Sequence, residues 1–185
     1  MKEQADLKSI LKAGKLTNEL DLERALILDN KLRLLAKDNP ELIESRKRLR
    51  SIIKQYEKKN WSKESAIDEQ KIKESDIAEF IAEQERVFLK NRKNAIKENL
   101  DKLKITQQEL GKILGHGKTY MSELMNGVSP FSMRDLIILH KLFGIKLEYL
   151  IPTIISEKDR VRIRTSLNQL NKAEIRFENE DLVFA

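Results

Sequence analysis

Apolar residues recur at helical spacing along most of the chain, and the breaks between these runs predict a series of packed helices. The first clear stripe begins after Asn18, a residue type that caps helices. A second stripe follows, with Asn39 as its expected N-cap and Pro40 at its first helical position. We therefore predict an antiparallel helical hairpin over residues 18–59, whereas the chain before Thr17 is expected to be weakly helical and frayed.

Helix boundaries are harder to place in the middle of the chain. Residues 60–74 are polar and predict either a linker or a poorly capped helix. Ser75 or Asp76 is then expected to cap a long apolar pattern that ends at Leu103. Its length predicts two helices, or one helix bent near residues 90–93. Because two helices alone bury little area, the hairpin needs cover from this segment, from a second copy of the chain or from another protein.

The stretch over residues 106–127 predicts two short helices joined by a tight turn. Thr106 and Glu109 have the spacing of a capping box at the start of the first helix. The run Gly115-His116-Gly117 ends that helix, and a second helix begins at Lys118. Two short helices with such a turn form the DNA-reading helix-turn-helix, whose second helix enters the major groove.

The remaining patterns complete an all-α fold. Ser132 is expected to cap a helix that ends at Gly144 and faces inward through Leu136, Ile137, Leu139 and Leu142. A short helix is predicted over residues 157–170, and residues 174–184 predict either a small terminal β-hairpin or a frayed tail. The fold class is thus an N-terminal helical hairpin or bundle followed by a five-helix repressor-like helix-turn-helix domain. The expected domains are residues 1–85, 86–152 and 153–185.

The segment from Thr106 onward resembles the Cro/repressor (Xre) type of helix-turn-helix, through its Thr-Gln start, its Gly turn, the Tyr-x-Ser of its reading helix and the closing Asn-Gly. With a helical segment in front of it, the chain is similar to HigA-type antitoxins, which repress their own promoter and neutralise a HigB-like ribonuclease toxin. The resemblance implies DNA contacts at four positions: Gln107, Lys118, Thr119 and Ser122.

Three further residues are candidates for the same interface. Tyr120 either donates its hydroxyl to a phosphate or packs, and packing is the favoured interpretation. Glu123 stands where many relatives carry Arg, Lys or Gln, and its carboxylate either repels phosphate or accepts a hydrogen bond from cytosine N4. Asn126, with Gly127, forms a turn whose backbone N–H groups could meet a phosphate.

The positive charge of the chain is concentrated on the same segment. The net charge is +6, and residues 86–152 hold twelve basic and six acidic residues. The segments on either side, residues 1–85 and 153–185, are each neutral. A polyanion partner explains this asymmetry.

Composition and motifs exclude several classes of function. The chain has no cysteine and is 36% charged and 5% aromatic, which favours a slender helical bundle. The two histidines lack clustered partners, so neither a metal nor a cofactor is expected, and no catalytic motif appears. No signal peptide or membrane span is expected, which predicts a cytoplasmic protein with no membrane partner.

We therefore expect a homodimeric antitoxin that binds double-stranded operator DNA and a small basic ribonuclease toxin. The alternatives are a free-standing helix-turn-helix regulator and a protein-interaction module that has lost DNA binding. The toxin is expected to contact either acidic residues of the neutral half or the terminal strands, namely Glu41, Glu44, Asp68, Glu69 and Glu74, or Phe177 and Phe184.

Overall fold

The computed structural model describes residues 6–62, 68–152, 157–172 and 175. Helices and no strands make up this part of the chain, so the all-α prediction is confirmed. In chain order the helices are α1 (Leu7–Ala13), α2 (Glu19–Leu35), α3 (Leu42–Asn60), α4 (Glu69–Leu103), α5 (Gln107–Leu114), α6 (Lys118–Asn126), α7 (Met133–Phe143), α8 (Leu147–Leu150) and α9 (Glu157–Gln169). The predicted C-terminal β-hairpin lies outside the described residues.

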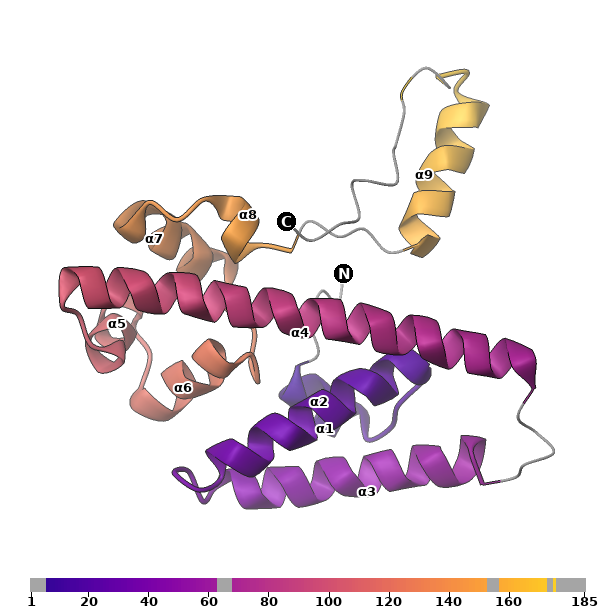
Figure 1. The fold of residues 1–185 in the computed structure, drawn as a ribbon, viewed down its shortest axis with the longest axis horizontal. Helices are drawn as coiled ribbons and strands as arrows, with labels where there is room; N and C mark the ends of the chain where they lie inside the picture. The colour runs from indigo at the N-terminus through magenta and orange to yellow at the C-terminus, as the bar shows by residue number, and fades with distance from the viewer. Residues whose placement is uncertain (1–5, 63–67, 153–156, 173–174, 176–185) are drawn as a thin grey trace.

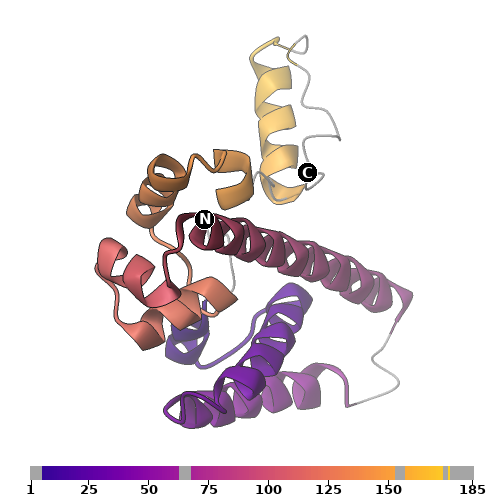
Figure 2. The ribbon, with the colours of Figure 1, turned by 60° about the vertical axis from the view of Figure 1, so that its left-hand side comes forward.

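The long helix α4 is the axis of the molecule. Figures 1 and 2 show α2 beside its N-terminal part, with α3 on the far side of α2, while α5 to α8 lie around its C-terminal part. It is one continuous helix of 35 residues, so the predicted two-helix arrangement is wrong, and the bend expected near residues 90–93 stays a prediction. The prediction that it begins after Ser75 or Asp76 is wrong, because the Asp68 carboxylate accepts a hydrogen bond from the Lys71 N–H and caps the helix earlier.

A first hydrophobic core joins α1, α2 and α3. Leu28, Leu32 and Leu49 are among its fully buried side chains. Helix α4 packs along α2, so the third helix covers the flank that the hairpin leaves open. The Arg24 guanidinium bonds to the Glu85 carboxylate, with 2.8 Å between Nε and Oε2, and fixes α2 against α4.

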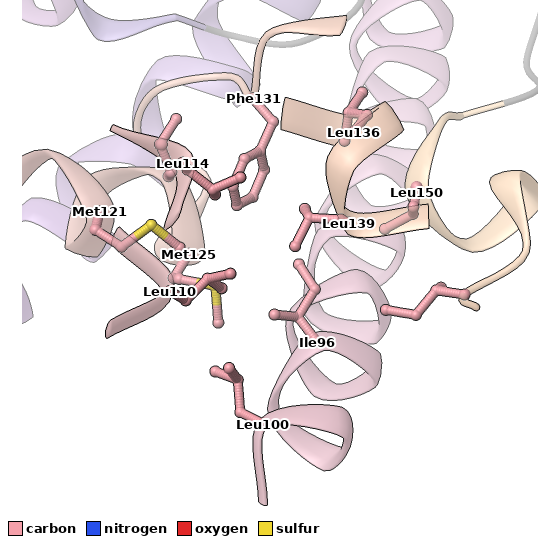
Figure 3. Packing of buried hydrophobic residues seen from close by; sticks show 12 residues of the cluster. Ile96, Leu100, Leu110, Leu114, Met121, Met125, Phe131, Leu136, Leu139 and Leu150 are labelled. Carbon is pink, nitrogen blue, oxygen red and sulfur yellow. The ribbon is translucent and has the colours of Figure 1, made fainter. Parts of the chain in front are cut away.

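The second core belongs to the helix-turn-helix segment. Figure 3 shows its side chains converging from α4, α5, α6, α7 and α8. Ile96, Leu110, Leu114 and Leu139 are fully buried there. The expected domain boundary at residue 85 falls inside α4, which packs on α2 and also contributes Ile96 and Leu100 to the second core.

Three local predictions need correction. Within the expected frayed segment, Leu7–Ala13 form the helix α1, because Asp6 caps that helix and Leu7 is buried in the first core. Helix α3 begins at Leu42, since the turn bonds from Leu42 and Ile43 to the Asn39 and Pro40 carbonyls keep the chain in a turn for two more residues. On α7, Leu136 and Leu139 face inward as predicted, but Ile137 and Leu142 are exposed because they lie on the far side of the helix.

Candidate nucleic-acid interface

Helix α5 is positioned by the predicted capping box. The Thr106 N–H donates to Glu109 Oε2 over 2.8 Å, and the Glu109 N–H donates to Thr106 Oγ1 over 3.2 Å. The hydrogen bonds from Thr106 lower the pKa of the Glu109 carboxyl, which keeps this acceptor charged. The capping box therefore fixes where α5 begins and leaves Gln107 as its first residue.

The turn between α5 and α6 depends on two glycines. Gly115 has a φ of 80°, a left-handed conformation that side chains resist. Gly111 lies where α5 and α6 approach closely: a Cβ atom there would be 3.0 Å from the His116 carbonyl oxygen and 3.5 Å from Met121 Cβ. Sequence reasoning missed Gly111, although a glycine inside a helical pattern is the signal of a close approach.

His116 ties this turn to α7. Its Nε2 lies 3.0 Å from Asp135 Oδ1, and Asp135 also accepts the Ser132 hydroxyl at the start of α7. Burial alone would raise the pKa of the Asp135 carboxyl, but the hydrogen bonds from Ser132 and His116 hold it below its usual value. His116 thus has a structural partner in Asp135.

Helix α6 buries one face and presents another. Met121, Leu124 and Met125 are buried, as predicted, and anchor the helix in the second core (Figure 3). Gly127 ends the helix with a φ of 65°. Lys118 is exposed at its first turn, and Thr119 and Ser122 are half-buried.

The four residues expected to contact DNA are brought together in one groove. We call this groove, which has a volume of about 740 Å³, the reading groove. One wall is lined by residues of α5 and α6, namely Gln107, Gln108, Lys118, Thr119, Met121 and Ser122. The first turns of α5 and α6 both reach it, so backbone N–H groups and the positive ends of two helix dipoles contribute to its potential. Such an arrangement suits phosphate oxygens and base edges.

The other three candidates lie apart from the reading groove. Tyr120 packs edge-on against His116, with 5.1 Å between ring centroids, as the favoured interpretation had it. The Glu123 carboxylate accepts the Ser129 hydroxyl over 2.9 Å. The Asn126 amide donates to the Ser122 carbonyl over 2.7 Å and accepts from Lys93 Nζ over 2.6 Å.

The opposite wall of the reading groove comes from the turn between α2 and α3. Asp38, Asn39 and Glu41 line it, and the turn lies below α6 in Figure 1. The sequence predicted this turn but not its position beside α5 and α6. No local pattern reports a packing contact between segments that lie far apart along the chain. Two carboxylates therefore stand beside the expected DNA contacts.

Helix α1 approaches the reading helix from the other direction. The Leu7 N–H lies 3.4 Å from the Val128 carbonyl oxygen, and Val128 is fully buried in the first core. The Lys8 amine lies 5.0 Å from the centre of the Tyr120 ring, a cation–π contact. Burial, together with the carboxylates of the surrounding chain, raises the pKa of the Tyr120 hydroxyl. Lys8 thus adds a cation near α6 that the sequence did not single out.

The described ranges hold neither a cluster of metal-ligand side chains nor a helix suited to a membrane. In residues 6–62, 68–152, 157–172 and 175, no three His, Cys, Asp or Glu side chains converge as metal ligands would. Among the described helices, none combines the length and the apolar character that crossing a membrane requires.

Comparison with known proteins supports the assignment of this segment. No curated protein and no solved structure matches the chain. Residues 96–150 match the family model described as Helix-turn-helix, which spans the end of α4 through α8. Residues 96–150 are therefore an Xre-family helix-turn-helix domain, the DNA-binding unit of transcription regulators.

Proposed function

We propose that the chain regulates transcription by binding operator DNA through the reading groove. The convergence of Gln107, Lys118, Thr119 and Ser122 at the first turns of α5 and α6 carries this proposal. Lys118 and Thr119 read base edges, Ser122 contacts a base or sugar one turn later, and Gln107 holds a phosphate at the α5 N-terminus.

Tyr120, Glu123 and Asn126 have supporting roles in this proposal. Tyr120 braces the α5–α6 turn through His116, and Glu123 holds the loop after α6 through Ser129. The hydrogen bond from Ser129 orients the Glu123 carboxylate toward the loop after α6 and leaves its negative charge in place.

The acidic turn of the N-terminal unit makes the groove selective. Asp38 and Glu41 place negative charge beside a site that receives a polyanion. Like charges lower the affinity for every duplex, so only a duplex that supplies the base contacts binds well.

Salt titration of duplex binding tests the proposal. If a homodimer neutralises about 6 phosphates, log K falls against log salt with a slope near roughly −5. Fluorescence anisotropy of a labelled duplex between 50 and 200 mM salt, which is about the range over which such binding declines, measures the slope. An affinity that does not change with salt would contradict DNA binding and would favour a protein-interaction module.

At a finer level, we propose that the chain is an antitoxin that also neutralises a small basic ribonuclease. An uncovered apolar face on α4 supports a protein partner: Ile77 is 60% exposed and Phe80 is 65% exposed, one helical turn apart. Two of the acidic residues expected to meet a basic partner, Glu69 and Glu74, belong to the same helix. Of these, Glu69 follows the cap of α4 and Glu74 lies one turn further on.

Copurification and separated functions test the antitoxin proposal. Untagged chain should bring down a small basic protein, and Lys118→Ala with Thr119→Ala should lose repression while still protecting cells that make the toxin. Ile77→Ser with Phe80→Ser should have the opposite effect. If no small protein copurifies and repression alone is found, the chain is a free-standing regulator.

A further inference from the structure

A second groove lies at the opposite end of α6 from Lys118. It has a volume of about 610 Å³ and runs between α2 and α4, with Met125 and Asn126 of α6 in its wall. We call it the basic groove. Five cationic side chains line it: Lys31, Arg33, Arg86, Lys90 and Lys93. Glu83 supplies a carboxylate to the same wall, and it is paired with Arg86 over 2.6 Å.

Two amines of the basic groove, those of Lys31 and Lys93, bond to neutral oxygen atoms. On α2, Arg24 is matched by the Glu85 carboxylate. Further along α2, Lys31 Nζ instead lies 3.4 Å from the Gly127 carbonyl oxygen. Lys93 Nζ likewise bonds to the Asn126 amide oxygen over 2.6 Å. The positive charge of the groove is therefore only partly balanced within the described residues.

The cations also disturb one another. Burial, together with the nearby charges of Arg92, Arg86 and Lys93, lowers the pKa of the Lys31 amine to about 8, against the opposing effect of Glu85. The nearby positive charges and the burial thus make protonation of the Lys31 amine less favourable. A bound anion would relieve this repulsion and favour the protonated amine.

Between the cations the basic groove has an apolar floor. Ile27 and Leu34 contribute from α2, Leu89 from α4 and Met125 from α6. An apolar surface flanked by a few convergent charged groups is the usual character of a small-molecule site, and about 300–1,000 Å³ is its usual size. A duplex backbone would use the charges but not this floor.

We propose that the basic groove binds an organic phosphate of nucleotide size. Lys31, Lys90 and Lys93 contact its phosphate oxygens, and its organic part lies on the apolar floor. The ligand would touch α2, α4 and the end of the reading helix at once, without entering the reading groove.

Calorimetric titration of the full chain with ATP tests the proposal, using ATP as a probe of the class. Saturable binding should weaken about tenfold in Lys31→Met and in Lys90→Gln, the usual effect of losing one charge-assisted hydrogen bond. Lys54→Gln, which removes an exposed amine from α3, is the matched control and should bind as the parent does. Lys31→Met removes a partly buried charge, so this variant should remain folded.

Three further titrations give decisive outcomes. Tripolyphosphate should bind more weakly than ATP, because it cannot use the floor. At pH 8, ATP binding should be accompanied by uptake of roughly half a proton in the parent and by less in Lys31→Met. If the same lysine variants weaken a duplex instead and ATP does not bind, the groove serves the DNA backbone and the proposal is overturned. Equal losses with Lys54→Gln would overturn it as well.

Discussion

Asp135 shows how one buried carboxylate can organise the helix-turn-helix segment. Its side chain is about 3% exposed and accepts hydrogen bonds from the Ser132 hydroxyl and N–H. The third partner, His116, comes from the turn before the reading helix. His116 therefore links the α5–α6 turn to the start of α7, beside the packing of the second core.

Replacing His116 with Ala should destabilise the protein by about 1–3 kcal/mol, because it removes a hydrogen bond to a buried charged group. Although burial would raise it, the hydrogen bonds from Ser132 and His116 hold the pKa of the Asp135 carboxyl below 3.8, the ordinary value for an aspartate. Its contribution to stability is thus present above pH 3.8 and is lost as the pH falls through the lower, folded pKa. The deficit of His116→Ala should therefore shrink in acid, as measured by urea unfolding at a series of pH values.

His140→Ala is the matched control for this prediction. His140 Nδ1 lies 2.8 Å from the Ile145 carbonyl oxygen, which does not titrate. The control should lose stability by an amount that does not depend on acid in the same range. A deficit of His116→Ala that stays constant from pH 7 to pH 3 would contradict the role given to Asp135.

Lys118 and Gln107 should differ in what they contribute to DNA binding. Lys118→Ala should cost about 1–3 kcal/mol at the operator if the amine reads a base edge. Gln107→Ala should weaken operator and random duplexes alike, because a phosphate contact carries no sequence information. Competition binding with both duplexes measures the difference. Equal effects of the two variants on both duplexes would argue against base reading by Lys118.

At the scale of elements, the turn between α2 and α3 is the least expected neighbour of the reading helix. Asp38→Asn together with Glu41→Gln removes two negative charges from the wall of the reading groove. Non-specific duplex affinity should rise by roughly 1 kcal/mol for the pair at low salt, or about fivefold, and by less at high salt. Anisotropy titrations with random duplex at two salt concentrations provide the measurement.

The control for this variant is another pair of carboxylates with the same total charge. Glu57 on α3 and Asp76 on α4 are exposed and are absent from the reading groove. Glu57→Gln with Asp76→Asn should change duplex affinity much less. If both double variants raise affinity equally, net charge and not the position of the turn is responsible.

Local signals in the sequence were sufficient to predict where the helices of the helix-turn-helix segment begin and end. Thr106, Gly115 and Ser132 act on neighbours within a few residues, so their caps could be predicted from spacing. The start of α4 could not be placed as well, because Asp68, Ser75 and Asp76 are all competent caps and the structure uses the first. Propensity alone does not choose among equivalent caps.

The candidate site was only partly predictable, for a different reason. Gln107, Lys118, Thr119 and Ser122 follow from the geometry of two short helices, and the structure brings them together. Asn126 was grouped with them through its place in the turn, but its amide is held by Lys93 on α4. Contacts of this kind join distant segments, so no periodicity along the chain reports them.

On the scale of the whole molecule, α4 makes the N-terminal unit and the helix-turn-helix segment one packed body. Phe88 and Arg92 lie near its middle and are buried. Arg92 stacks over the rings of Phe88 and Phe131, with 5.2 Å from its guanidinium carbon to the centre of the second ring. Its Nη1 lies 3.3 Å from the Leu150 carbonyl oxygen. The helix that packs on α2 thus also holds the far end of the DNA-binding segment.

This shared helix predicts that both cores unfold together. Val128 follows the reading helix but is buried in the N-terminal core, and Lys31 of α2 contacts the Gly127 carbonyl, so unfolding either core strips contacts from the other. Scanning calorimetry of residues 1–152 should give one transition whose calorimetric and van 't Hoff enthalpies agree. Val128→Ala should lower that single midpoint, because truncating a buried aliphatic side chain typically costs about 1 kcal/mol or more. Two separate transitions, with only one moved by Val128→Ala, would mean that α4 links two independent domains.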